Sequence, residues 1–298
     1  MRALAFSLWA SVVFVVMALV WGLAAGSQMI VFDGLYSLVS VGLSAISVAA
    51  HRIVAKGPDA SYPWGRETWE PVAIVVKATA LGGLCVYGSV NAVREILHGG
   101  RAVSAVSALV YAITASLLSV VVALVLLRAS RSGSGLVRAE AAEWAGDAAL
   151  SLVTLAGFAV AVALVRAGNE VAARYVDPAL VIIVSMIYLW IPVRLFRGAF
   201  REILTMAAPA PVLSQVQRIC EDIRAEYGFD ESLVRAGTVG SRLDLEFAFV
   251  LGPDTPHRDV GSFDAVRAEI QRSLTAVGYH HSTSVVFTAQ RRWVQWDN

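Results

Sequence analysis

The sequence predicts a polytopic α-helical membrane protein with six transmembrane helices, followed by a small C-terminal α/β domain. Of its 298 residues, 57% are hydrophobic and only 16% are charged, whereas a soluble domain averages about 25% charged residues. The chain also contains several apolar stretches that can each cross about 30 Å of hydrocarbon as a helix. After residue 208 the composition becomes that of a soluble domain. We therefore expect a membrane domain over residues 1–208 and a soluble domain over residues 209–298.

The apolar stretches give the six expected helices. The first, residues 3–23, resembles a signal peptide, but its apolar core is longer than the roughly 7–15 residues of a cleaved signal, so an uncleaved helix is favoured. The fifth contains Glu143 and Asp147 and runs to residue 165, and a flexible linker without histidines, residues 128–135, precedes it. The other four cover about residues 28–54, 71–93, 102–127 and 177–195.

Lysine and arginine residues near the helix ends predict the orientation. One side of the membrane collects ten: Arg2, Arg52, Lys56, Arg66, Arg128, Arg131, Arg138, Arg194, Arg197 and Arg201. The other side collects four: Arg94, Arg101, Arg166 and Arg174. We expect a multi-pass protein of the cell (inner or cytoplasmic) membrane with both termini in the cytoplasm.

The C-terminal residues alternate between helix and strand patterns. Residues 212–227 and 259–277 have helical spacing, while residues 232–239, 243–251 and 283–288 read as strands. The order α-β-β-α-β fits a small, ferredoxin-like open sandwich on the cytoplasmic side. A domain of this size gains stability from a second copy, so we expect a homodimer.

Acidic residues in the fifth span are the strongest sign of function. Glu143 and Asp147 are four residues apart and therefore stack on one face of a helix, with Glu140 one turn earlier. A carboxylate at membrane depth costs roughly 2.5–3.5 kcal/mol on insertion scales. These side chains are therefore expected to face a cavity or an ion, unless a partner such as Lys77 neutralises them.

The second span carries a matching polar stripe. Asp33, Tyr36, Ser37 and Ser40 fall at positions i, i+3, i+4 and i+7 of one helix face. Two oxygen-lined faces within a membrane suggest a cation path. Other interpretations remain open: Asp33 as a helix N-cap, Tyr36 and Ser40 as interhelical hydrogen-bonding groups, and Glu140 as a partner of Arg138 or a group at the ion entrance.

Several motifs together resemble the cation diffusion facilitators. They are Asp-Gly-Leu-Tyr-Ser-Leu-Val from Asp33, Tyr-Pro-Trp-Gly-Arg from Tyr62, Glu-Pro from Glu70, and Arg-Ala-Glu from Arg138, along with the six spans and the α-β-β-α-β tail. The resemblance covers nearly the whole chain. It implies a homodimeric antiporter that exchanges a divalent metal ion for protons. It also implies a central site with two ligands from the second helix and two from the fifth.

Carried over by position, the fifth-helix ligands are Glu143 and Asp147, and the second-helix ligands are Tyr36 and Ser40. The family pattern has histidine or aspartate followed by aspartate in the second helix, so Tyr36 and Ser40 depart from it and leave Asp33 as the only carboxylate there. All five are predicted metal ligands. The tail departs too, because His257, His280 and His281 are expected outside the strands, as surface residues.

The predicted ligands are all oxygen donors, which favour manganese, iron or cobalt over zinc, although the family resemblance favours zinc. The metal is the transported ion rather than a cofactor, and protons compete with it for the carboxylates. Two other functions remain open: a monovalent cation/proton exchanger and a non-transporting partner subunit. Enzyme motifs such as Gly-x-Ser-x-Gly, a phosphate loop or Cys-x-x-Cys are absent, and the net charge of +1 gives no support for a nucleic-acid partner.

Overall fold

The computed structural model describes residues 2–130, 135–253, 255–256 and 259–294. In this part of the chain six helices are long and apolar enough to cross a membrane, which confirms the predicted number. They are α1 (Arg2–Ala25), α2 (Gln28–Val54), α3 (Trp69–Leu97), α4 (Ala105–Ser130), α5 (Gly135–Arg166) and α7 (Val176–Ile203). A short helix, α6 (Glu170–Ala173), lies between the fifth and sixth predicted spans. Residues 131–134 of the predicted linker are outside the described part.

The chain forms two compact units. Unit 1 comprises Met1–Ile46 and Val76–Leu195, and unit 2 comprises Ser47–Val75 and Phe196–Asn298. The predicted domain boundary after residue 208 falls between α7 and the next helix and stays a prediction. The segment that joins α2 to α3 belongs to the same unit as the C-terminal residues.

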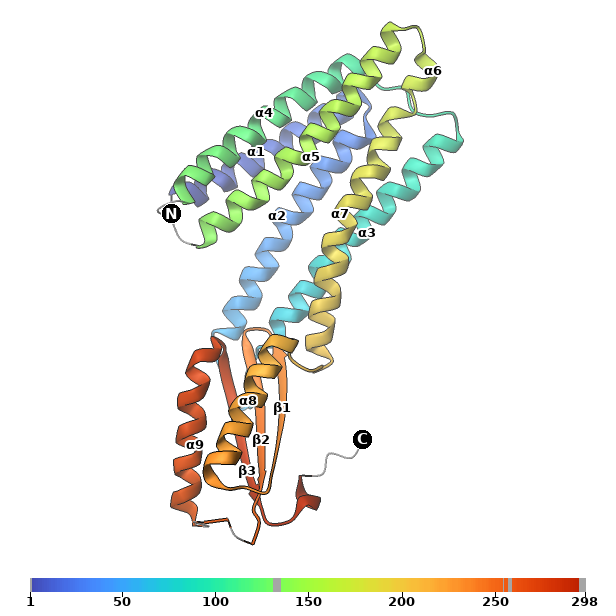
Figure 1. Cartoon of the computed structure of the whole chain (residues 1–298). Helices are drawn as coiled ribbons and strands as arrows, with labels where there is room; N and C mark the ends of the chain where they lie inside the picture. Colours follow the sequence, from blue (N-terminus) through green and yellow to red (C-terminus); the bar gives the residue numbers. More distant parts are fainter. Residues whose placement is uncertain (1, 131–134, 254, 257–258, 295–298) are drawn as a thin grey trace. The chain divides into compact units, whose positions relative to one another are not determined.

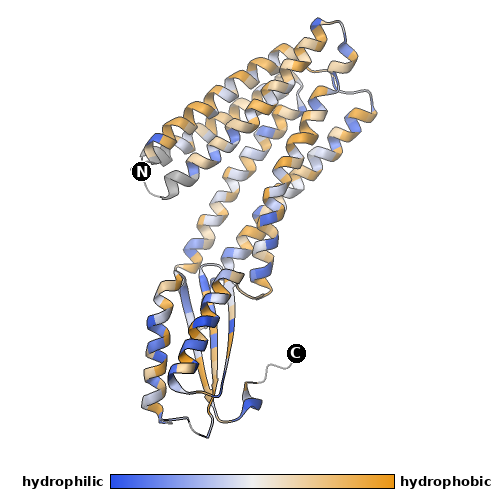
Figure 2. Ribbon diagram, viewed as in Figure 1, coloured by the Kyte–Doolittle hydropathy of each residue, from blue (hydrophilic) through white to orange (hydrophobic). Residues whose placement is uncertain are grey.

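Unit 1 is a bundle in which α4 and α5 run side by side and α1 packs against both (Figure 1). Apolar residues dominate α1, α4 and most of α5, as expected for surfaces in contact with lipid (Figure 2). The core includes Phe14 from α1, Ile30 from α2, Tyr111 from α4 and Phe158 from α5, all nearly inaccessible to solvent.

Gly34 brings α2 close to α1. A Cβ atom at this position would lie 2.9 Å from the Cβ of Ala18 and 3.0 Å from a methyl group of Leu19. Only glycine therefore fits, which is the behaviour of small residues at helix contacts in membranes. The contact fixes α2 against α1 beside Asp33, at the beginning of the polar stripe.

Unit 2 contains a three-stranded sheet with helices on one face. The elements follow the order α8 (Ala210–Tyr227), β1 (Glu231–Val239), β2 (Arg242–Val250), α9 (Val260–Leu274) and β3 (His280–Thr288), with single 3₁₀ turns at Thr275–Val277 and Arg291–Trp293. Strand β2 is central, antiparallel to β1 and parallel to β3. Alternate residues of β2, including Leu243 and Phe247, pack against α8 and α9. The predicted α-β-β-α-β order is confirmed.

The histidine prediction was wrong in one respect. His280 and His281 are the first two residues of β3 and pair with Arg242 and Leu243 of β2, so the strand begins earlier than its apolar pattern suggested. The preceding Gly278 has a positive φ of 74° and ends the 3₁₀ turn, which lets pairing start at once. His257 lies outside the described residues.

The Tyr-Pro-Trp-Gly-Arg motif folds the segment between α2 and α3. Arg66 is 9% exposed, donates hydrogen bonds to the Asp59 carboxylate and to the Gly57 carbonyl oxygen, and lies 4.3 Å from the centre of the Tyr62 ring. The guanidinium hydrogen bond lowers the pKa of Asp59. Arg242 of β2 then donates to the Trp64 carbonyl oxygen and to the same segment's Glu67 (2.9 Å). The motif therefore has a structural explanation within unit 2.

Candidate functional site

Four of the five predicted ligands line one pocket in unit 1. The pocket has a volume of about 60 Å³ and lies among α1, α2 and α5. Its walls include Glu143 and Asp147 from α5 and Tyr36 and Ser40 from α2, together with Ser37 of the same stripe. Helical spacing puts each pair on one face of its own helix, and the packing of the helices brings the two faces to one pocket.

The two carboxylates of this pocket have no protein partner. Among the described residues, neither Glu143 nor Asp147 forms a hydrogen bond or an ion pair with another side chain or with the backbone. Other acids act on both groups electrostatically: Asp33 and Glu143 on Asp147, and Glu140 on Glu143. The positive charge of Lys77 also acts on Glu143, but the two form no ion pair within the described structure. Acidic groups are thus concentrated where charge is poorly solvated.

Tyr36 is fixed by stacking. Its ring lies on the ring of Tyr188 in α7, with centroids 4.0 Å apart and an angle of 14° between the planes. The ring of Phe32, one turn earlier on α2, also packs near the Tyr36 ring, with the two centroids 6.3 Å apart. Such pairs contribute about 0.5–1.5 kcal/mol beyond the buried area. The stacking holds Tyr36 in the pocket wall, so bracing of the helices and a place beside the ion are compatible roles.

Asp33 is not among the residues that line the pocket. Its Oδ2 accepts a hydrogen bond of 3.1 Å from the Tyr111 hydroxyl of α4. The Tyr111 ring is itself held edge-on by Trp21 of α1, at a centroid distance of 6.1 Å. Asp33 is six residues into α2, so it is not the N-cap of that helix. Its role as a metal ligand stays a prediction.

Glu140 connects α5 to α1. The Ser7 hydroxyl donates to Glu140 Oε2 over 2.5 Å, and Trp144 Nε1 donates to the Ser7 oxygen over 2.9 Å. The alternative, a pairing of Glu140 with Arg138, stays untested because the Arg138 side chain is outside the described part of the structure. Glu140 therefore has a protein partner, which sets it apart from the two acids one and two turns further along the helix.

The pocket offers a mixed set of oxygen donors. It combines two carboxylates with a phenol and serine hydroxyls, and hard divalent cations are bound by such donors. No group of three or more histidine, cysteine, aspartate or glutamate side chains that could hold a metal ion occurs in the described ranges. The pocket offers a cation hydroxyl oxygens in addition to its two carboxylates. Neither cysteine lines the pocket: Cys85 of α3 is buried in the core of unit 1, and Cys220 is in unit 2, where burial raises its pKa to about 11.

Sequence reasoning missed a second acidic site, around Asp177 at the start of α7. Its side chain is 2% exposed and accepts three hydrogen bonds from the first residues of α2 and the turn before it. The donors are the Ser27 hydroxyl (2.5 Å), the Gln28 N–H (2.8 Å) and the Met29 N–H (3.3 Å). Asp177 thus caps the N-terminus of α2 from another helix, and the negative charge also suits the helix dipole.

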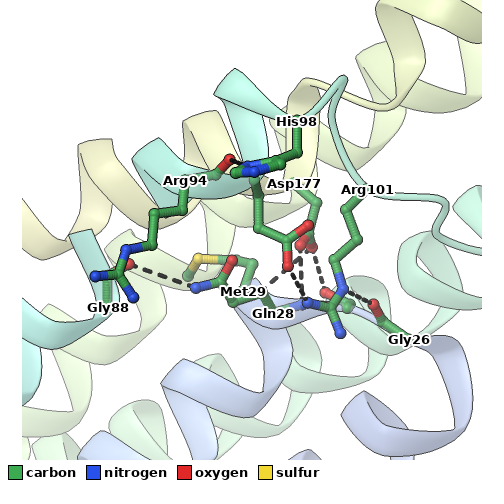
Figure 3. Close-up of polar contacts among 10 residues, drawn as sticks. Gly26, Gln28, Met29, Gly88, Arg94, His98, Arg101 and Asp177 are labelled. Carbon is green, nitrogen blue, oxygen red and sulfur yellow. Dashed lines mark hydrogen bonds and ion pairs between the residues drawn. The ribbon is translucent and has the colours of Figure 1, made fainter. Parts of the chain in front are cut away.

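Arg101 completes this acidic site, as Figure 3 shows. Its charge acts on Asp177, its Nε donates to the Gly26 carbonyl oxygen (2.6 Å), and its Nη1 donates to Glu95 (2.9 Å). The network joins the turn before α2, the segment before α4, the end of α3 and the first turn of α7. The sequence signal was only an aspartate before Pro178, which marks a helix start but does not reveal which helix the carboxylate caps.

Comparison with protein families agrees with this architecture. Residues 4–204 match the model of the cation efflux transmembrane domain, which covers all six spans. No match to a curated protein reaches significance. The match spans about two thirds of the chain and includes every residue of the pocket. The protein therefore belongs to the cation efflux family, the cation diffusion facilitators, whose members transport metal cations across membranes and are not enzymes.

Proposed function

We propose that the protein exports a divalent metal cation in exchange for protons and that the ion binds in the pocket between α2 and α5. The observation that carries this proposal is the pair of partnerless carboxylates, Glu143 and Asp147, in the pocket wall. Isolated carboxylates are costly in a medium of low dielectric constant unless they are protonated or neutralised by a cation. A site that alternates between these two conditions exchanges metal for protons.

The charges support a divalent ion. Two carboxylates balance the charge of a dication, and two protons balance the same carboxylates after the ion leaves. Tyr36 and Ser40 add neutral oxygen donors. Asp33 is retained as a ligand that joins when its bond to Tyr111 is released. Oxygen donors favour manganese, iron or cobalt ahead of zinc.

We further propose that two copies assemble through their C-terminal domains, with both termini of each chain in the cytoplasm. The support is physical. The helices α8 and α9 cover one face of the sheet, and the other face carries charges of both signs that are paired within the chain, Arg235 with Glu246 and Arg242 with Asp244. A pattern of alternating charges can meet its own copy with opposite charges in contact.

Tyr36 and Ser40 stand where the family pattern has two strong ligands, which favours one alternative, the exchange of a monovalent cation for protons. A single charge requires fewer carboxylates and accepts hydroxyl oxygens readily. A partner subunit without transport activity is the other alternative, but the partnerless carboxylates would then carry a cost without a use.

Transport by purified protein in liposomes with an imposed pH gradient tests all three functions. We expect saturable uptake of radiolabelled manganese that requires the gradient, with weaker uptake of zinc and no uptake of sodium. The control is a variant in which both acids are neutralised, Glu143→Gln with Asp147→Asn. Sodium uptake without any divalent uptake would establish the monovalent exchanger. Failure of every cation to move would favour the partner subunit.

A further inference from the structure

We propose that α1 forms a third wall of the cation pocket and that Ser11 is a specificity-determining ligand, whose hydroxyl oxygen binds the ion. This inference rests on the proposed function and names a donor for the same site. Neither the residue spacing nor the family pattern, which take ligands from the second and fifth helices, points to α1. Ser11 lines the pocket together with Glu143 and Asp147, and the adjacent Phe14 lines it as well.

Contacts on either side of Ser11 determine where it faces. Ser7, Ser11 and Phe14 occupy positions i, i+4 and i+7 of α1 and therefore share one face. Ser7 accepts the indole hydrogen bond of Trp144, and Phe14 meets the same indole edge-on at a centroid distance of 6.4 Å. Trp144 follows Glu143 directly on α5. The two contacts hold the Ser11 face of α1 against the acidic face of α5.

The hydrogen bonding of Ser11 leaves its oxygen available. The hydroxyl donates its only proton to the Ser7 carbonyl oxygen over 3.0 Å, within α1. Its two lone pairs then remain for a positive partner. A hydroxyl oriented in this way is a neutral oxygen ligand, and it leaves the charge balance between the ion and the two carboxylates unchanged.

The replaced ligands of α2 explain why a further donor is useful. Hard divalent ions take about six oxygen ligands or more, some of them water. The two carboxylates, Tyr36 and Ser40 provide four protein side chains, and Ser11 provides a fifth. Because the added donor is neutral and hard, it should change which ion is preferred more than the rate at which protons are exchanged.

Cysteine substitution offers a test by gain of function. Ser11→Cys replaces a hard donor with a soft one, so the ratio of cadmium to manganese transport should rise at least tenfold. Ser11→Ala removes the donor and should raise the KM for manganese several-fold while the maximal rate stays within about twofold. The matched control is Ser44→Cys, because Ser44 makes the same bond to a carbonyl one turn back (Ser40, 3.0 Å) but is exposed and outside the pocket.

Thiol labelling provides a readout that does not depend on transport. Manganese should slow maleimide labelling of Ser11→Cys and leave Ser44→Cys unaffected, with the parent protein giving the background from Cys85 and Cys220. Equal cadmium-to-manganese ratios in the two cysteine variants, with no protection by manganese, would overturn the role of Ser11. Loss of all divalent transport in the parent protein would instead overturn the proposed function. If Ser11→Cys does not fold, the KM of Ser11→Ala decides, since an unchanged KM contradicts ligation.

Discussion

Asp147 and Asp177 are acidic residues of the same helical unit, but their surroundings are opposite. Asp177 is almost fully buried, accepts three hydrogen bonds from the start of α2 and lies near the charge of Arg101. Asp147 lines a pocket and makes no hydrogen bond or ion pair within the described structure, while its charged neighbours are the acids Asp33 and Glu143. One carboxylate is fully used by the fold, whereas the other remains available to an ion.

This difference distinguishes an acid that the fold uses from an acid that the fold leaves available. A buried charge that the fold requires is expected to be paired and hydrogen-bonded, because the unpaired state is costly. A charge that the fold leaves unpaired must be compensated by something from outside. The same substitution, aspartate to asparagine, should therefore have opposite consequences at the two positions.

The largest effect should follow Asp147→Asn. Loss of one partner of a buried charge pair costs about 3–5 kcal/mol, which corresponds to a loss of at least about 100-fold in divalent transport at low metal concentration. The substitution hardly changes shape and removes an uncompensated charge, so thermal stability in detergent should be unchanged or slightly higher. Initial uptake rates and a thermal unfolding curve measure both quantities. Wild-type transport by this variant would contradict the assignment of the pocket.

Asp177→Asn should have a smaller effect, and it should lower the thermal stability of the protein rather than its transport activity. The amide can still accept from Ser27, but it cannot satisfy both the Gln28 and Met29 N–H groups. One unsatisfied buried donor costs about 1–3 kcal/mol, which lowers the unfolding temperature by about 5 °C in a chain of this size. Transport per folded molecule should stay within about twofold of wild type. Normal stability with abolished transport would mean that Asp177 belongs to the ion path instead.

The sequence predicted the pocket residues around Asp147 but not the surroundings of Asp177. Helical spacing is enough to place Glu143 above Asp147 and Tyr36 beside Ser40, since each pair lies on one continuous helix. Contacts between helices are set by packing, which spacing does not encode. For that reason the cap supplied by Asp177, the bond between Tyr111 and Asp33, and the place of Ser11 in the pocket emerged only with the fold.

In the C-terminal domain, too, the sequence predicted the elements correctly but not all of their details. Alternation of apolar residues predicted three strands and their order, because one face of the sheet packs on helices. The start of β3 was missed because His280 and His281 are polar, although the backbone of each pairs with β2. Backbone pairing does not require an apolar side chain at the exposed end of a strand, so the pattern underestimates strand length there.

The smallest effect is expected from Ser40→Asp, which adds a carboxylate to the pocket. Ser40→Asp restores the acidic residue that the family pattern carries at this position, one turn beyond Tyr36 and within the pocket that holds Asp147. A third carboxylate strengthens attraction to a dication but adds repulsion when the site is empty, so we expect about five- to tenfold tighter manganese binding, or about 1–1.4 kcal/mol. Because release then becomes slower, the maximal transport rate should fall, and the variant should be less stable without metal than with it. Titration calorimetry and thermal unfolding with and without manganese measure these changes. Weaker manganese binding in Ser40→Asp would show that position 40 faces away from the ion, and the pocket would then rest on the acids of α5.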